Sequence, residues 1–208
     1  MTDASALLII DCQRDFCPGG ALAVAGGHEI LPLIHDLQSR FAHVIATQDW
    51  HPADHSSFAS QHEGKAPFET MEMAYGTQVL WPDHCVQGTL GAEFHEALDV
   101  TRVELILRKG FRRGVDSYSA FFENDKRTRT GLEGYLRERG IGTLYLCGLA
   151  TDYCVAFSAL DARRLGFETH VVLDACRGID LNGSVAVMLD AMRQAGVAIV
   201  TSEALPRR

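Results

Sequence analysis

The strongest constraint on the fold is an alternation between continuous apolar runs and segments with helical periodicity. Six runs rich in Val, Ile and Leu predict strands, because apolar runs without polar alternation are typical of strands buried on both faces of a parallel sheet. Four intervening segments place apolar residues at helical spacing and predict helices covering that sheet. The predicted strands are 6–11, 43–49, 103–109, 143–149, 170–175 and 197–201, and the predicted helices are 28–41, 131–140, 154–167 and 184–196.

These elements predict an α/β fold, a three-layer α/β/α sandwich around a mainly parallel sheet of about six strands joined by right-handed crossovers. The chain contains no repeat, low-complexity segment or linker, so we expect a single domain over residues 1–208. Pro32 is compatible with the first helix only within its first turn. Residues 50–102 are dense in His, Pro, Trp and Gly and weak in periodicity, which predicts a loop-rich, functional insertion.

Charge and composition argue against several classes of function. The net charge is −8, from 19 Lys+Arg against 27 Asp+Glu, and no basic block is present, so we expect neither nucleic-acid nor membrane partners. No apolar run reaches the roughly 18 residues of a membrane span, and the first ten residues lack the basic start of a secretion signal. Six cysteines without a C-x-x-C pair indicate a reducing, cytoplasmic location.

Polar side chains follow the carboxyl ends of four predicted strands. Asp11 ends the first, Asp49 ends the second with His51 just beyond, Lys109 ends the third, and Cys154 follows the fourth through a turn. Each has an ordinary explanation when taken singly: a turn-capping Asp, a solvated Lys, a Cys packed in the core. Open parallel sheets bind their ligands beyond the carboxyl ends of the strands. Because all of these side chains are predicted at that one edge, a functional site is favoured there.

Cys154 carries the sharpest chemical signal. At the start of a predicted helix, the helix dipole and the nearby Lys109 are expected to lower the pKa of its thiol. The resulting thiolate is a nucleophile, and Asp11 would take the thiol proton and later give it to a leaving amine. Backbone N–H groups of the preceding turn would stabilise an oxyanion by roughly 3 kcal/mol each. These groups together predict amide hydrolysis through a thioester, whereas Cys147 is assigned to core packing.

The segments 49–55 (DWHPADH) and 81–85 (WPDHC) form a second group. An Asp-x-His pair with distant histidines suits a divalent metal such as zinc or iron, bound through oxygen and nitrogen. The alternative is that loop histidines are merely polar surface, and spacing alone weighs the two interpretations equally. The histidines assigned to the surface are His28, His35, His43, His62, His95 and His170.

Five segments then carry a resemblance: 9–24, 47–59, 81–95, 108–121 and 148–155. They span nearly the whole chain, and in them the sequence resembles bacterial nicotinamidases (pyrazinamidases) of the isochorismatase-like cysteine hydrolase superfamily. The Asp-Trp-His-Pro and Trp-Pro-x-His-Cys pieces are the most specific, because metal-free relatives lack them. The resemblance implies the isochorismatase-like hydrolase fold and metal-dependent conversion of nicotinamide to nicotinate and ammonia in NAD salvage, with pyrazinamide as a further substrate.

The resemblance also implies site residues and a cofactor. One divalent metal ion, with zinc expected before iron or manganese, would hold the ring nitrogen of nicotinamide. Monomer and homodimer both stay open. The implied catalytic residues are Asp11, Lys109 and Cys154, the oxyanion N–H groups are those of Ala150 and Cys154 after a cis Leu149–Ala150 peptide, the substrate-binding aromatic walls are Phe16, Trp81 and Tyr118, and the metal ligands are Asp49, His51 and His84.

Two positions and two rival functions complete the expectations. His55 is left outside the ligand set, and Arg14 replaces an Asn common in relatives, which is expected to alter the surroundings of the metal. The nearer rival is an amidohydrolase of the same superfamily acting on an N-carbamoyl or ureido substrate, which the paired metal motifs disfavour. The second rival function is a non-catalytic thiol sensor or metal-binding module. It would need neither Asp11 nor Lys109, so the presence of both residues disfavours it.

Overall fold

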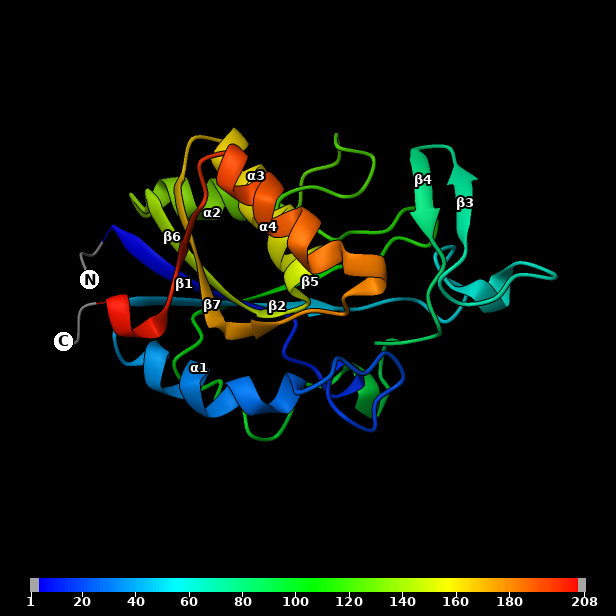
Figure 1. The fold of residues 1–208 in the computed structure, drawn as a ribbon, viewed down its shortest axis with the longest axis horizontal. Helices are drawn as coiled ribbons and strands as arrows, with labels where there is room; N and C mark the ends of the chain where they lie inside the picture. The colour runs from blue at the N-terminus through cyan, green and yellow to red at the C-terminus, as the bar shows by residue number, and fades with distance from the viewer. Residues whose placement is uncertain (1–3, 206–208) are drawn as a thin grey trace.

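The computed structural model describes residues 4–205, and its centre is a six-stranded sheet in the order β5-β2-β1-β6-β7-β8. Every neighbouring pair in this sheet is parallel. The predicted fold class is therefore confirmed (Figure 1). The strands are β1 Ser5–Ile10, β2 His43–Asp49, β5 Leu105–Lys109, β6 Thr143–Leu149, β7 Glu168–Arg177 and β8 Ala198–Val200.

Helices cover both faces of the sheet. Helix α1 lies on one face, and α2, α3 and α4 lie on the other (Figure 1). Pro32 falls in the first turn of α1, as expected, but the helix is shorter than predicted because residues Gly27–Ile30 form a separate 3-10 turn. The helices are α1 Leu31–Gln38, α2 Leu132–Glu138, α3 Ala156–Arg164 and α4 Ser184–Gln194.

The core explains why the strand runs carry no polar alternation. Every residue of β1 is buried, and Leu7, Leu8, Ile9 and Ile10 have no exposed surface. Burying one such side chain contributes about 1.5–3 kcal/mol. The carboxyl end of β1, where Asp11 follows, is thus anchored in the buried core.

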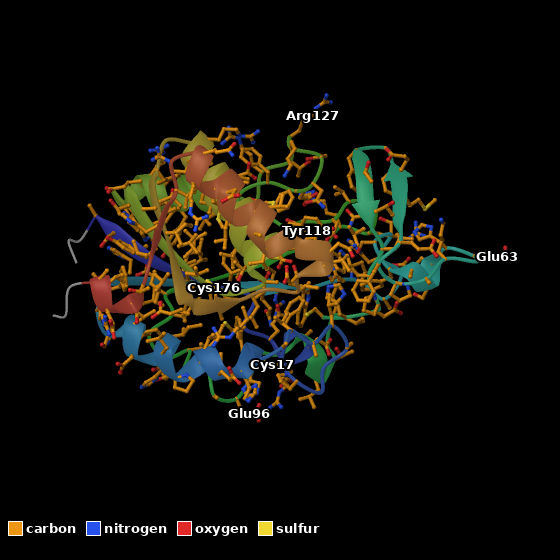
Figure 2. The ribbon with its side chains drawn as sticks, viewed as in Figure 1. Cys17, Glu63, Glu96, Tyr118, Arg127 and Cys176 are labelled. Atoms are coloured by element: carbon orange, nitrogen blue, oxygen red, sulfur yellow. The ribbon has the colours of Figure 1, made fainter. Side chains whose placement is uncertain are left out.

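The segment predicted to be a loop-rich insertion, residues 50–102, contains some regular structure. This segment contains an antiparallel hairpin of β3 Thr70–Met73 and β4 Gly76–Val79, which lies to one side of the main sheet (Figure 1). Glu63 marks the outer tip of the loop before the hairpin (Figure 2). Each hairpin strand has only four residues, and β4 has no polar and apolar alternation, so the hairpin is too short to stand out in the sequence pattern.

The cysteines and surface histidines can now be placed. All six cysteines are free thiols and all are buried. His28 and His35 are exposed as expected. The other four histidines assigned to the surface are partly exposed: His43, His62, His95 and His170. No helix within residues 4–205 has the length and apolar character needed to cross a membrane.

Candidate active site

Lys109 joins the carboxyl ends of three neighbouring strands. It is the direct register partner of Asp49 across β2 and β5, and Asp11 follows β1 beside them. The Lys109 Nζ lies 2.8 Å from Asp11 Oδ2 and 2.5 Å from Asp49 Oδ1, and it donates to the Ser117 carbonyl oxygen at 2.9 Å. Lys109 is 1% exposed and Asp11 is 0% exposed, so one buried cation holds two buried carboxylates.

Cys154 completes this cluster from the fourth strand. It lies in a π-helical turn, Thr151–Val155, that follows β6 and leads into α3. Its Sγ accepts a hydrogen bond from Lys109 Nζ at 3.3 Å. Its sulfur and a carboxylate oxygen of Asp11 lie within 4.8 Å of each other. The Leu149–Ala150 peptide before the turn is cis, as the resemblance implies.

Gly148 allows β6 to end directly against β1. Its φ is +117°, and a Cβ at this position would lie 2.1 Å from the carbonyl oxygen of Ile10. Only glycine tolerates both the left-handed backbone and so close an approach. The turn carrying Cys154 therefore starts beside the residue that precedes Asp11.

Proton affinities in the cluster differ from the expectation for a helix-start cysteine. Burial raises the pKa of the Cys154 thiol well above its ordinary value, although Lys109 acts in the opposite direction. The predicted lowering is wrong because the sulfur is desolvated and lies near carboxylates. Burial likewise raises the pKa of Asp11 to about 6, with Lys109 partly offsetting it. At neutral pH the proton therefore resides on sulfur and Asp11 is mostly ionised.

Two buried residues support the carboxylates and were missed in the sequence. Thr47 Oγ1 donates to Asp11 Oδ1 at 2.6 Å. Gln13 Nε2 donates to the Asp49 carbonyl oxygen at 2.8 Å, and Gln13 Oε1 accepts from the Asp49 N–H at 2.7 Å. A signal existed for Thr47, which lies two residues before Asp49 within β2, because residues two apart along a strand share a side. Gln13 lies beyond the end of β1, where strand periodicity does not apply.

A cavity lies beside this cluster and is lined by Cys154. Its aromatic walls together with a few polar side chains are typical of a small-molecule site. Ala150 lines it beside Cys154, as expected for an oxyanion turn. The predicted aromatic walls Phe16, Trp81 and Tyr118 all line it, together with residues that were not predicted: Leu22, Asp116, Tyr153 and Ile179.

Asp49, His51 and His84 lie on the cavity wall and offer ligand atoms that all lie within 4.8 Å of one another. The Nδ1 of His51 lies 2.8 Å from the Gly110 carbonyl oxygen, and the Nδ1 of His84 lies 2.8 Å from that of Pro82. Since a carbonyl only accepts, each Nδ1 donates, and in the neutral imidazole each Nε2 keeps a free lone pair. This donor set fits a divalent metal ion.

Gly110 shapes the place of His51. A Cβ on Gly110 would lie 2.4 Å from His51 Cε1, so any other residue there would displace the imidazole. The φ of Gly110 is +64°, which also favours glycine. The glycine that follows Lys109 thus lets one short segment hold both the lysine and the histidine.

His55 and Arg14 lie differently with respect to this wall. The two ring nitrogens of His55 contact Ser57 Oγ at 2.7 Å and the Val115 carbonyl oxygen at 3.3 Å. Both nitrogens contact the protein, and a ring nitrogen of His55 also lies within 4.8 Å of ligand atoms of His51 and Asp116, so whether His55 joins the ligand set stays a prediction. Arg14 pairs with Glu96 at 2.9 Å and lines a separate depression, so the structure gives no contact for its expected influence on the metal.

Comparison with known proteins agrees with this geometry. The Isochorismatase domain family model matches residues 5–204. The nicotinamidase of Acinetobacter baylyi is 54% identical over 197 residues, which cover 95% of this chain and 92% of that one. A solved nicotinamidase/pyrazinamidase structure from Acinetobacter baumanii superposes with a TM-score of 0.97 at 55% identity, covering 98% of both chains.

A more distant structure shares the fold. The pyrazinamidase of Pyrococcus horikoshii, solved in complex with zinc, superposes with a TM-score of 0.78 at 36% identity, covering 95% of this chain and 99% of that one. The family match leaves out only a few residues at either end. As the motifs in its sequence predict, the chain belongs to the isochorismatase family.

Proposed function

We propose that the chain is a cysteine amidohydrolase that converts nicotinamide to nicotinate and ammonia, a reaction of NAD salvage, and that also hydrolyses pyrazinamide. The observation that carries this proposal is the contact of Lys109 with both Asp11 and the Cys154 sulfur beside an aromatic-walled cavity. The names of the relatives reported above support nicotinamide and pyrazinamide as substrates. Cytoplasm is the proposed compartment, because free thiols such as the six here persist under reducing conditions.

The reaction begins with proton transfer from the Cys154 thiol to the Asp11 carboxylate. The raised pKa of Asp11 makes its carboxylate a stronger base, whereas the raised pKa of the thiol opposes the transfer, and Lys109 offsets part of that cost by stabilising the thiolate. The sulfur attacks the carboxamide carbon, and the backbone N–H groups of Ala150 and Cys154 stabilise the oxyanion. Asp11 then gives the proton to the departing nitrogen, so ammonia leaves and a thioester remains.

Hydrolysis of the thioester uses the same groups. Asp11 takes a proton from water, the resulting hydroxide attacks the acyl carbon, and the proton returns to sulfur as nicotinate is released. Lys109 stays charged throughout: burial opposes its charge, but Asp11 and Asp49 raise its pKa well above the ordinary value. Its role is to hold Asp11 in place and stabilise the developing thiolate.

Phe16, Trp81 and Tyr118 are proposed to hold the pyridine ring. All three line the cavity, and the Trp81 and Tyr118 rings meet edge to face with centroids 6.2 Å apart. Flat aromatic walls bind a flat heteroaromatic ring through stacking and edge contacts, with little loss of side-chain entropy. The ring is thereby oriented before the carboxamide reacts.

Asp49, His51 and His84 are proposed to hold one divalent metal ion, with zinc as the first candidate. When bound there, the ion supplies a Lewis-acid contact for the pyridine nitrogen. The two carboxylate oxygens of Asp49 face different groups: its Oδ1 contacts Lys109, and its Oδ2 lies 3.7 Å from His51 Nε2. Lys109 and the other neighbours of Asp49 outweigh the effect of burial and keep the pKa of its carboxyl well below the usual range, so it is ionised and able to bind a cation.

The proposal is tested by incubating the purified protein with nicotinamide. We expect ammonia and nicotinate in equal amounts, a bound divalent metal, and a fall in kcat/KM of about 100-fold after chelation, since misplacing a substrate by about 1 Å costs about that much. Restoring zinc should restore the rate. Turnover of an N-carbamoyl amine but not of nicotinamide would favour the rival amidohydrolase instead.

A pH profile tests the assignment of Asp11 as the base. Its carboxylate accepts the thiol proton only when ionised, and its pKa is about 6. We expect kcat/KM to fall tenfold per pH unit below about pH 6, because protonated Asp11 cannot act as a base. Circular dichroism at each pH would separate this effect from unfolding. A rate that stays flat down to pH 4.5 would contradict the assignment.

A further inference from the structure

Gln78 is a buried amide on an otherwise exposed hairpin. It is 1% exposed, whereas its neighbours on β4, Gly76 and Thr77, are exposed. A buried amide is costly unless its polar atoms are hydrogen-bonded. The position of Gln78 therefore calls for specific partners, and they connect the hairpin to the wall of the cavity.

The side chain of Gln78 joins the hairpin to two other segments. Its Nε2 donates to Asp116 Oδ2 at 2.9 Å and to Tyr118 Oη at 2.7 Å. Its Oε1 accepts from Asn124 Nδ2 at 3.1 Å and from Tyr75 Oη at 3.2 Å. Asn124 closes the network, because its Oδ1 accepts from the backbone N–H of Tyr118 at 3.1 Å. Such a network of buried hydrogen bonds restricts every side chain in it.

Two rings of the cavity wall depend on this network. The Tyr118 hydroxyl accepts from Trp81 Nε1 at 3.1 Å as well as from Gln78. Tyr118 is partly buried, and its label stands beside the helical layer on the side that faces the hairpin (Figure 2). Asp116, Tyr118 and Trp81 line the cavity, while Gln78 does not. Gln78 thus bonds to residues that line the cavity without lining it itself.

We propose that Gln78 is a positioning residue for substrate: through Tyr118 and Trp81 it sets the geometry of the slot that receives the ring. The inference rests on the proposed function, since the slot is assigned to the pyridine ring there. Gln78 contacts none of Asp11, Lys109 or Cys154 through the bonds described. Its loss should therefore weaken binding of substrate more than it slows the chemical steps.

The variant Gln78→Glu tests this role. It replaces the amide donor with a carboxylate that faces Asp116, so the bond to Asp116 is lost and repulsion between the two carboxylates should move the side chain away from its present contact with Tyr118. We expect KM for nicotinamide to rise about tenfold or more while kcat changes by less than about threefold. This pattern is expected when a variant loses interactions that bind the substrate and the transition state equally well. Gln61→Glu is the matched control: Gln61 is exposed and its side chain contacts Ser60, so KM should not change.

A second substitution provides a rescue. Combining Gln78→Glu with Asp116→Asn reverses the polarity of the pair and restores an amide-to-carboxylate hydrogen bond at this position. KM of the double variant should recover most of the way toward the wild-type value. An unchanged KM in Gln78→Glu, an equal rise in Gln61→Glu, or a double variant no better than the single one would overturn the proposal.

Fluorescence gives a readout that does not depend on turnover. The chain has two tryptophans, so Trp50→Phe leaves Trp81 as the sole indole. In this background, Gln78→Glu should shift the Trp81 emission and increase its quenching by acrylamide. No change in either would count against the role of Gln78 even if nicotinamide is not the substrate. If Gln78→Glu does not fold, Gln78→Met, which removes the amide without adding charge, is measured in the same way.

Discussion

Replacing Cys154 with alanine is expected to lower nicotinamide turnover by on the order of 10⁵-fold, the loss typical of removing a covalent nucleophile. The sulfur is the only group of the cluster able to form the thioester, and neither Asp11 nor Lys109 can replace it. The fold should persist, because the change removes one small side-chain atom at the edge of a cavity. Ammonia release and circular dichroism measure the two effects.

Cys147→Ala is the matched control for this variant. Cys147 is also a buried free thiol, but it lies within β6 and does not line the cavity. We expect it to retain turnover close to the wild-type rate. Intact-mass measurement during turnover should detect an acyl adduct in the control and none in Cys154→Ala. Near-normal ammonia release by Cys154→Ala would end the cysteine mechanism.

Lys109→Met is expected to lower the free energy of unfolding by about 3–5 kcal/mol, the usual result of removing one partner from a buried ion pair. The change leaves the carboxylates of Asp11 and Asp49 buried without their shared cation. Turnover should fall as well, because Asp11 loses its anchor. Urea denaturation measures the stability. Lys65→Met, which removes an exposed lysine paired with Glu69, should change it by less than about 1 kcal/mol.

The pH dependence of this loss identifies its cause. Without Lys109, we expect burial to raise the folded-state pKa of Asp11 further and to raise that of Asp49, which Lys109 helps to hold low. Raised pKa values favour the folded state at low pH, and this contribution is lost as the pH rises through them. The loss of unfolding free energy in Lys109→Met, relative to the wild type, should thus be smaller at pH 5 than at pH 8. Adding Asp11→Asn should recover part of the stability but none of the turnover. A deficit independent of pH would point to packing instead.

The outline of the fold and the charged cluster could be predicted from the sequence. Strands covered on both faces must be apolar throughout, so their runs are visible without any knowledge of tertiary contacts. Parallel strands end at one edge, so Asp11, Asp49 and Lys109, which end or follow successive strands, had to meet there. The apolar runs are a local property of the sequence. The meeting of strand ends at one edge follows from a general rule for parallel sheets, so both could be predicted without coordinates.

Properties that depend on burial and on distant contacts were decided only by the tertiary structure. The pKa of Cys154 rises because packing desolvates its sulfur beside carboxylates, which outweighs the helix-start effect expected from its position. The hairpin that carries Gln78 is held by hydrogen bonds to residues about 40 positions away, and no local pattern reveals these partners. Periodicity along the chain determined which elements form and where they end. Desolvation and long-range hydrogen bonding, which require the assembled core, determined the proton affinities and the shape of the cavity.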